Sequence, residues 1–495
     1  MSLIQVSNLT FSYEGSYDDI FSDASFQIDT AWRLGFCGRN GRGKTTFLKL
    51  LMGEHEYRGT ITASVLFDYF PFQVADRALD TMQILSAIAP DAPAWQIQKE
   101  ISKLAISEDA LYRPFESLSN GEQTKSLLAG LFLRSNHFLL IDEPTNHLDL
   151  AARETVARYL GSKSGFILVS HDRAFLDACV DHILSINKAN IEVMKGNFTT
   201  WWEQKKLKDA YELAQNEQLG QEIGRLQEAA GRAVRWADKA EGRKIGFDPR
   251  KTEKSAGRRP YEAAKSAKLM KRAKNVEKRR QDAIDEKSKL LKNVETPDDL
   301  KIIPLAHHAS RLIIFEDLSI RYGCREIITG LCFSLQQGDR MALRGGNGSG
   351  KSSLLKLICG EDIPHSGQMN IASKLVISYV PQDASFLSGD LKGYARDMQI
   401  DETLLKSILR KLDFSRTQFD KDMGDFSAGQ KKKVLLAGSL LTQAHVYIWD
   451  EPLNYIDVLS RIQIEELIMK YRPTLLFAEH DRAFCENVAT RVIDL

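Results

Sequence analysis

Two short stretches of this chain carry glycines followed by a lysine and a hydroxyl residue at matching intervals. The first runs from Gly38 to Thr46 and the second from Gly345 to Ser353. Both have the spacing G-x-x-x-x-G-K-[S/T], in which backbone N–H groups converge on phosphate oxygens at the start of a helix. In this pattern Lys44 reaches the β- and γ-phosphates of a nucleotide and the Thr45 hydroxyl binds Mg²⁺. The sequence therefore predicts two phosphate-binding loops, each between a strand and a helix.

Three further motifs follow each loop in the same order. In the first half they are LSNGEQ (118–123), LLIDEP (139–144) and SHD (170–172). In the second half they are FSAGQ (426–430), YIWDEP (447–452) and EHD (479–481). Matching residues of the two halves lie 307 to 309 positions apart. A repeat this even predicts two homologous domains.

This ordered set of motifs resembles the ATP-binding cassette (ABC) ATPases, and DEPTNHLD at 142–149 resembles their ABC-F class. The resemblance implies an α/β fold class, with two tandem ABC-type P-loop ATPase domains joined by a long α-helical hairpin linker. We expect the first ABC ATPase domain at residues 1–198, the linker at 199–306 and the second ABC ATPase domain at 307–495. The implied reaction is hydrolysis of ATP to ADP and phosphate, with ATP and Mg²⁺ bound.

The resemblance also implies roles for side chains near the phosphates. Glu143 and Glu451 are expected to orient and polarise the attacking water, because phosphoryl transfer depends mainly on positioning and charge neutralisation. His171 and His480 are expected to hydrogen-bond the γ-phosphate. A single histidine is usually structural, but two at matching repeat positions favour this function. The residues expected on the metal side are Thr45, Gln73, Asp142, Ser352, Gln382 and Asp450.

The nucleotide-binding residues implied by the family fall into three groups. Tyr13 and Tyr322 stand where the family places the aromatic ring that stacks on adenine; the alternative is a strand-end tyrosine that packs on the core. The loop residues are Gly38, Asn40, Gly41, Gly43, Lys44, Thr45 and Thr46, and Gly345, Asn347, Gly348, Gly350, Lys351, Ser352 and Ser353. The signature residues are Ser119, Gly121 and Glu122, and Ser427, Gly429 and Gln430.

In the family, each ATP lies between the phosphate loop of one cassette and the signature of the other. Site one would thus combine Lys44 and Glu143 with Ser427 and Gly429. Site two would combine Lys351 and Glu451 with Ser119 and Gly121. The chain departs from the family at Asn120 and Ala428, which replace a signature glycine, and at Leu453 and Tyr455, which stand where the first half has Thr145 and His147. We expect two competent sites that differ in rate.

Positive charge is concentrated between the two halves. Residues 231–280 contain 18 Lys and Arg against 6 Asp and Glu, a net charge of +12 in a chain that carries +1. Apolar residues recur every seven positions on both sides of a Gly/Pro-containing turn, which predicts an antiparallel helical hairpin with its tip at about 243–260. The alternative is a solvated charged linker. Basic helices suit RNA, and Phe247 either stacks on a base or packs within the loop.

Stretches such as WRLGFCGRNGRGKTT (32–46) and YIWDEPLNYIDV (447–458) are similar to the Lsa-type ABC-F ribosome-protection proteins. This similarity implies binding to the bacterial 70S ribosome at the tRNA exit site, with 23S rRNA and P-site tRNA as partners of the basic linker. It also implies displacement of lincosamides, pleuromutilins and streptogramin A from the peptidyl-transferase centre. A housekeeping ABC-F translation factor and the ATPase subunit of an exporter are the alternatives.

The composition, 43% hydrophobic and 27% charged, is that of a globular protein with two or three cores. No apolar run approaches the length that crosses a bilayer, and the first residues lack the pattern of a secretory signal. The six cysteines show no metal or redox spacing, which favours a reducing compartment. We therefore expect a cytoplasmic monomer, without membrane contact, whose two ATPase domains pair with each other.

Overall fold

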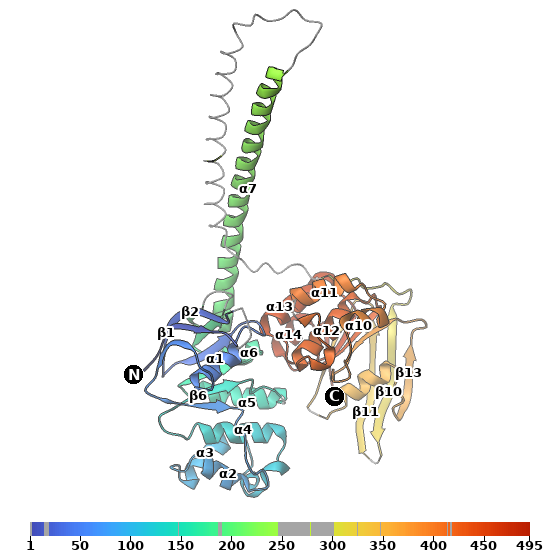
Figure 1. Ribbon diagram of the computed structural model, residues 1–495. Coiled ribbons are helices and arrows are strands. Elements are labelled where there is room, and N and C mark those ends of the chain that lie inside the picture. Colours follow the sequence, from blue (N-terminus) through green and yellow to red (C-terminus); the bar gives the residue numbers. More distant parts are fainter. Residues whose placement is uncertain are drawn as a thin grey trace, which may run out of the picture. The chain divides into compact units, whose positions relative to one another are not determined.

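The computed structural model describes residues 2–13, 19–146, 148–186, 191–245, 278, 301–323, 325–346, 348–412, 414–415 and 418–495 (Figure 1). The chain divides into two compact units. One unit contains Met1–Trp201 and Pro297–Leu495, and the other contains Trp202–Thr296. Both halves of the sequence repeat thus belong to the first unit.

The first half builds two sheets. One is antiparallel with the order β2-β1-β4, and the other has the order β5-β6-β7-β3-β8-β9 and is parallel except at the pair β8–β9. The strands are β1 (Leu3–Phe11), β2 (Phe21–Asp29), β3 (Arg33–Cys37), β4 (Arg58–Thr62), β5 (Leu66–Phe70), β6 (His137–Asp142), β7 (Phe166–Val169), β8 (His182–Ile186) and β9 (Ile191–Lys195). The helices are α1 (Lys44–Leu51), α2 (Thr81–Ile88), α3 (Ala94–Lys103), α4 (Asn120–Leu131), α5 (Leu150–Gly161) and α6 (Arg173–Cys179), with short 3-10 helices η1 (Glu108–Tyr112) and η2 (Phe115–Ser117).

The second half repeats this plan. An antiparallel sheet has the order β11-β10-β13, and a parallel sheet has the order β14-β15-β16-β12-β17. The strands are β10 (Arg311–Tyr322), β11 (Arg325–Gln336), β12 (Arg340–Arg344), β13 (His365–Ile371), β14 (Ile377–Val380), β15 (Val446–Asp450), β16 (Leu475–Ala478) and β17 (Arg491–Asp494). The helices are α9 (Lys351–Ile358), α10 (Leu391–Asp397), α11 (Glu402–Lys411), α12 (Ala428–Leu441), α13 (Val458–Tyr471) and α14 (Arg482–Val488), with the 3-10 helix η5 (Met423–Asp425).

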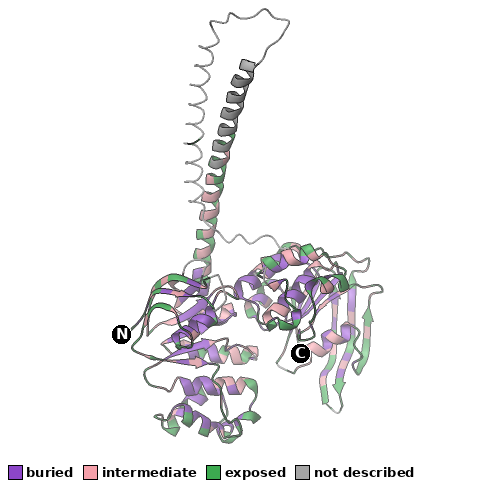
Figure 2. Ribbon diagram, in the orientation of Figure 1, coloured by how far each residue is buried: buried purple, intermediate pink, exposed green. Residues whose placement is uncertain are grey.

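The parallel sheets explain why distant motifs meet. Strands β6, β7, β15 and β16 are almost wholly buried, as expected for continuous apolar runs covered on both faces (Figure 2). In each half the strand before the phosphate loop pairs with the strand before the SHD or EHD motif. That strand in turn pairs with the strand that ends in the aspartate directly before the expected catalytic glutamate. Because parallel strands end at one edge of a sheet, all three motifs are brought to that edge.

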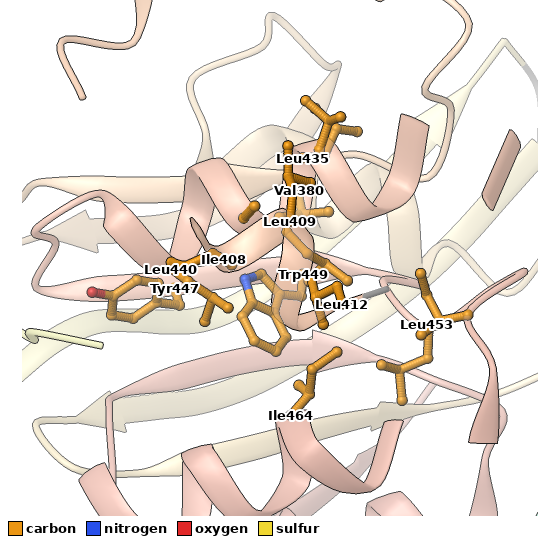
Figure 3. Packing of buried hydrophobic residues seen from close by; sticks show 14 of the residues in the cluster. Val380, Ile408, Leu409, Leu412, Leu435, Leu440, Tyr447, Trp449, Leu453 and Ile464 are labelled. Atoms are coloured by element: carbon orange, nitrogen blue, oxygen red, sulfur yellow. The ribbon is translucent and has the colours of Figure 1, made fainter. Parts of the chain in front are cut away.

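The second half has a large core that joins α12 to the sheet. Figure 3 shows part of this cluster, in which Trp449 lies among aliphatic side chains that include Leu409 and Leu412. Trp449 is fully buried, and its indole N–H donates to the hydroxyl of Ser439 on α12 at 3.0 Å. Tight packing of this kind transmits displacement, so α12 and β15 are expected to move together.

The second unit consists, as far as the structure describes it, mainly of the long helix α7 (Phe198–Ile245). A helix of 48 residues at 1.5 Å per residue is about 72 Å long. The outgoing arm of the predicted hairpin is therefore helical. Its return segment and most of its predicted tip lie outside the described residues, and the hairpin stays a prediction. None of the described helices is long and apolar enough to cross a membrane.

Candidate functional site

Both predicted phosphate loops join a parallel strand to a helix. The loop after β3 ends at Gly43, where φ is 87°, and the loop after β12 ends at Gly350, where φ is 97°. Glycine adopts this left-handed conformation at little cost. A Cβ on Gly43 would lie 2.5 Å from Cγ2 of Ile20, and one on Gly350 would lie 2.7 Å from Cγ2 of Ile327. Each loop therefore requires glycine at the point where the helix N-terminus meets it.

The two loop lysines are buried and face the carbonyl groups of their own loops. Lys44 Nζ donates to the carbonyl oxygens of Gly38 at 2.7 Å and Arg39 at 3.1 Å. Lys351 Nζ donates to the first two residues of its loop, at 2.9 Å each. Burial lowers the pKa of both ammonium groups, and nearby carboxylates oppose this fall. Charged phosphate oxygens are stronger acceptors than these carbonyls, so the loops are suited to phosphate.

Hydroxyl and carboxylate oxygens meet beside each lysine. Thr45 Oγ1 donates to Asp142 Oδ2 at 2.9 Å, and the Tyr69 hydroxyl donates to the same oxygen at 3.0 Å. In the second half burial raises the pKa of Asp450, and the nearby Ser352 hydroxyl opposes this rise, while neither carboxylate oxygen of Asp450 has a hydrogen-bond partner among the described residues. Such hard oxygen ligands fit Mg²⁺, which typically takes one or two protein oxygens and completes its shell with phosphate and water. In the described part of the chain, no group of three or more His, Cys, Asp or Glu forms a closed metal site.

The two expected catalytic glutamates share an unusual backbone conformation. Glu143 has a φ of 50° and Glu451 a φ of 46°. Left-handed conformations are uncommon outside glycine and concentrate at functional sites. The backbone N–H of Glu143 donates to Val169 O at 2.9 Å, and that of Glu451 donates to Ala478 O at 2.9 Å. Both acceptors end the neighbouring strand. Strand pairing thus continues to the glutamate, which lies at the edge of the sheet.

The surroundings of these two carboxylates differ. Glu451 accepts hydrogen bonds from Gln382 Nε2 at 2.9 Å and Asn454 Nδ2 at 2.6 Å, with His480 Nε2 at 3.4 Å. Burial alone would raise the pKa of Glu451, but these donors outweigh it and lower the pKa to about 2. The second glutamate is therefore ionised across the physiological range.

The first glutamate has fewer donors. His171 Nε2 lies 3.3 Å from Glu143 Oε1, and burial lowers the pKa of His171 well below its usual value, so the ring is neutral at pH 7. Burial raises the pKa of Glu143, and the neighbouring charge of Asp142 raises it further. Gln73 and its counterpart Gln382 are both exposed, but among the described contacts only Gln382 donates to its glutamate. The structure thus gives a physical basis for the expected difference between the sites.

The signature serines begin the helices α4 and α12. Ser119 and Ser427 are the N-caps, and both form capping boxes with the residue three positions later. The Glu122 carboxylate accepts a hydrogen bond from the backbone N–H of Ser119 at 2.9 Å. The Ser119 hydroxyl and this backbone N–H together lower the pKa of Glu122. In the second half Gln430 Oε1 accepts a hydrogen bond from the backbone N–H of Ser427 at 2.9 Å. Both signature helices thus present well-ordered N-termini, where anions are favoured.

Two clefts each combine residues that the family resemblance assigns to one site, although Lys44 does not line the first of them. A cleft of about 690 Å³ is lined by Asn40, Gly41 and Glu143 from the first half and by Ser427 and Gly429 from the second. A cleft of about 1000 Å³ has the reverse combination, with Ser119 and Gly121 opposite Lys351, Glu451 and His480. The structure therefore brings each phosphate loop and glutamate near the signature of the other half.

The tyrosines expected at the adenine ring lie beside the phosphate loops in both halves. The Tyr13 hydroxyl is 2.9 Å from Thr46 Oγ1, and the Tyr322 hydroxyl donates to Ser353 Oγ at 3.2 Å. The side chains are 45% and 46% exposed, so neither packs wholly in the core. Of the predicted site residues, Asn347 lies outside the described residues.

Sequence reasoning missed a pair of arginines 308 positions apart. Arg153 Nη1 donates at 3.1 Å both to Asp172 Oδ2 and to the backbone oxygen of His480. Arg461 Nη1 donates at 3.0 Å to Asp481 Oδ2, the equivalent aspartate. Arg153 thus connects Asp172 of the first half to His480 of the second half. The two arginines have the same spacing as the matching motif residues of the two halves, so the repeat could have identified them from the sequence.

A glycine-bounded loop between strand and helix, with carboxylates at the end of a nearby parallel strand, defines a P-loop ATPase. The sequence matches the family described as ABC transporter over residues 21–146 and 328–454, about half of the chain. The chain therefore belongs to the ABC transporter family, in the ABC-F form with two ABC ATPase domains in one chain. It is an ATPase, and the predicted fold class is confirmed.

Known relatives resemble the chain over almost its full length. Ribosome protection protein VmlR of Bacillus subtilis is 26% identical, over 96% of this chain and 84% of that protein. Energy-dependent translational throttle protein EttA of Haemophilus influenzae is 24% identical, over 96% of this chain and 89% of that protein. Among solved structures, the archaeal ribosome recycling factor aABCE1, crystallised with the stalk protein aP1, is similar with a TM-score of 0.63 and 18% identity, covering 98% of this chain and 87% of that one. This last likeness concerns the fold alone.

We expect hydrolysis at site one to require a higher pH than hydrolysis at site two. A carboxylate that polarises water acts in its ionised form, so the rate rises as pH passes its pKa. The pKa of Glu143 is raised and that of Glu451 is lowered to about 2, so the acid limb of site one lies at higher pH. The check is a pH–rate profile between about pH 5 and 9 for Glu451→Gln, which retains site one, and Glu143→Gln, which retains site two. Coinciding acid limbs would contradict this expectation.

Proposed function

We propose that this ABC-F ATPase is an ATP-dependent ribosome-binding protein that protects the bacterial ribosome from lincosamides, pleuromutilins and streptogramin A. It docks at the tRNA exit site of the 70S ribosome, and its basic linker contacts 23S rRNA and P-site tRNA. The observation that carries the proposal is the combination of two clefts, each lined by phosphate-loop residues of one half and signature residues of the other, with a segment of net charge +12 between the halves. The similarity to VmlR, a ribosome protection protein, supports it.

In this proposal each cleft closes around one ATP. The loop residues with Lys44 or Lys351 bind the phosphates, and Tyr13 or Tyr322 stacks on adenine. Mg²⁺, held by Thr45 and Asp142 at one site and by their counterparts at the other, neutralises phosphate charge. Both cleft linings support this arrangement, because each contains the signature residues of the opposite half. The chain acts as a monomer whose two halves take the place of two subunits.

Hydrolysis requires a water molecule placed in line with the γ-phosphate. Glu143 and Glu451 orient and polarise it, and His171 and His480 hold the phosphate. Their mutual distances, 3.3 Å and 3.4 Å, support a joint role in each half. Loss of the γ-phosphate removes the group that both halves contact, so the closed state is favoured only while ATP is bound.

The linker is proposed to carry this closure to RNA. A net charge of +12 within 50 residues gives strong, salt-dependent attraction to a phosphate backbone. Helix α7 continues without a break from Phe198, beside the first ATPase domain in sequence, to Ile245 within the basic segment. A continuous helix provides a stiff support for the segment that contacts RNA.

The proposal is tested by sedimentation with purified bacterial ribosomes. The Glu143→Gln/Glu451→Gln protein, which binds ATP but hydrolyses it slowly, is expected to co-sediment with 70S ribosomes when ATP is present. Raising salt from about 50 mM to 200 mM should weaken this binding by roughly 10³-fold or more if six or more phosphates are contacted. The matched control is Lys44→Ala/Lys351→Ala, which lacks the lysines that hold ATP and should stay in the supernatant. Absence of the first protein from the ribosome pellet at low salt would refute the proposal.

A second candidate is a housekeeping translation factor with the same ATPase and the same docking. The similarity to EttA, an energy-dependent translational throttle protein, favours it. Drug susceptibility of bacteria with and without the gene separates the two functions. If the gene raises the inhibitory concentrations of the three drug classes, the protein protects the ribosome. If the inhibitory concentrations of all three classes are unchanged, the function is that of a translation factor.

A further inference from the structure

The second half contains a buried lysine that the first half lacks. Lys432 lies on α12 and is only 2% exposed. Its Nζ donates to the backbone oxygen of Pro381 at 2.7 Å and to that of Asp450 at 3.3 Å. A buried ammonium group is strongly unfavourable unless it is hydrogen-bonded, so these two contacts hold the side chain in a fixed position.

Both acceptors belong to site two. Pro381 directly precedes Gln382, whose amide donates to the Glu451 carboxylate at 2.9 Å. Asp450 ends β15 and stands on the expected metal side, beside Ser352. The ammonium of Lys432 therefore joins the two backbone segments that carry the metal-side and water-side groups of site two.

The helix that carries Lys432 begins at the other site. Its N-cap Ser427 and the nearby Gly429 line the cleft that contains Glu143. Five residues along a helix span about 7.5 Å, so Lys432 lies less than two turns from this N-terminus. Leu435 and Leu440, farther along α12, pack in the cluster that contains Trp449 of β15 (Figure 3). Helix α12 thus connects the backbone of site two rigidly to the signature of site one.

A buried carboxylate accompanies this lysine. Glu479 is 7% exposed and accepts hydrogen bonds from Leu453 N at 2.7 Å and His480 N at 3.0 Å. Burial lowers the pKa of Lys432 to about 8, and Glu479 is the foremost of the carboxylates that oppose this fall. Burial raises the pKa of Glu479 itself, and the charge of Arg461 is the foremost influence that opposes this rise.

The corresponding positions of the first half are neutral. They are Thr124 and Ser170, which replace Lys432 and Glu479 at repeat offsets of 308 and 309. The Ser170 hydroxyl lies 3.4 Å from that of Thr145. A threonine side chain is too short to reach two backbone oxygens on separate segments as the lysine does. Lys432 thus makes this connection in the second half. In the first half the Arg77 guanidinium, four residues after Gln73, donates instead to Gln123 of α4.

We propose that Lys432 is a positioning residue that couples the two ATP sites through α12, so that ATP bound at site two raises turnover at site one. Binding of ATP at site two orders the segments around Gln382 and Asp450, and the lysine holds α12 to them. The signature of site one is then presented in its closing position. This inference rests on the proposed cross-paired ATP sites.

The test compares turnover at site one when site two is trapped with ATP and when it is empty. Glu451→Gln keeps ATP at site two, and Lys351→Ala prevents its binding there. In the otherwise unaltered chain we expect turnover at site one to be about tenfold faster in the trapped state, within the usual range of coupling between sites. In Lys432→Thr/Glu479→Ser, which gives the second half the residues of the first, we expect this ratio to fall to about twofold or less.

The reverse direction is a second readout. Because a rigid connection acts both ways, the ratio of site-two turnover between Glu143→Gln and Lys44→Ala should also fall in the paired variant. A purely structural defect would instead lower the turnover of every single-site protein and leave both ratios in place. Glu479 stays opposed by Arg461 when Lys432 is replaced, so Lys432→Thr alone serves if the paired variant fails to fold. Lys432→Arg, which keeps a cationic donor, should keep most of the ratio.

A matched surface control is Lys431→Met, from the neighbouring position on α12. Lys431 is only partly buried, and its Nζ lies 3.5 Å from Ser385 O. It should leave both ratios unchanged. An unchanged site-one ratio in Lys432→Thr/Glu479→Ser overturns the inference alone. Ratios near one in both directions for the unaltered chain overturn the cross-paired sites and this inference with them.

Discussion

Gly43→Ala is expected to lower ATP turnover at site one by about 100-fold, and Gly350→Ala to do the same at site two, because small displacements of phosphate-positioning groups have effects of this size. Both glycines have left-handed backbones, and an added Cβ would come within 2.5 Å of Ile20 or 2.7 Å of Ile327. Relief of that overlap displaces the helix N-terminus and the adjacent lysine. The measurement is nucleotide binding and turnover for each variant, with the opposite site inactivated by its Glu→Gln substitution.

Gly53→Ala is the matched control for this prediction. Gly53 also has a left-handed backbone, with φ at 74°, but a Cβ there would meet no atom within 4 Å. It should cost about 1–2 kcal/mol of stability through the backbone alone and leave turnover nearly unchanged. An equal loss of turnover in Gly53→Ala and Gly43→Ala would show that general destabilisation, not the shape of the loop, causes the effect.

Ser427→Arg is expected to abolish turnover at site one, although Ser427 lies in the opposite half of the chain from Glu143. Ser427 lines the site-one cleft and caps α12. An arginine at this position fills the cleft and removes the cap. Loss of a group that contacts developing phosphate charge typically lowers the rate by about 10²–10³-fold. We therefore expect turnover at site one to decrease by about 100-fold or more. The lost cap itself contributes only about 1 kcal/mol to stability.

Ser119→Arg is the symmetrical substitution. Ser119 caps α4 with the same type of capping box and lines the cleft of site two with Lys351. The two variants therefore share the stability cost and differ only in which cleft they fill. If Ser427→Arg impaired site two instead, each signature would serve its own half and the proposed pairing would be wrong.

Local patterns predicted the parts of the site that depend on local backbone geometry. Gly43 and Gly350 mark the phosphate loops because the turn itself demands glycine. Glu143 and Glu451 follow buried parallel strands, and such strands must end at one edge of a sheet. The even repeat predicted two domains, and the family match confirms both them and the ATPase activity.

Other features depend on residues that meet only after folding. The raised pKa of Glu143 and the lowered pKa of Glu451 follow from burial and from which donors reach each carboxylate, and the sequence alone does not specify these contacts. Lys432 appeared in a run of three lysines, a pattern usually found on a solvated surface, yet it is buried. Its partner Glu479 is 47 positions away, so no local pattern links them.

The central claim is that each ATP is closed between one half's phosphate loop and the other half's signature. The most direct measurement is single-site turnover for Ser427→Arg and Ser119→Arg, each combined with Glu451→Gln or with Glu143→Gln. We expect a crossed result: Ser427→Arg silences the Glu451→Gln protein, which works at site one, and Ser119→Arg silences the Glu143→Gln protein. An uncrossed result, with each signature substitution silencing the site of its own half, would contradict the pairing of the two halves.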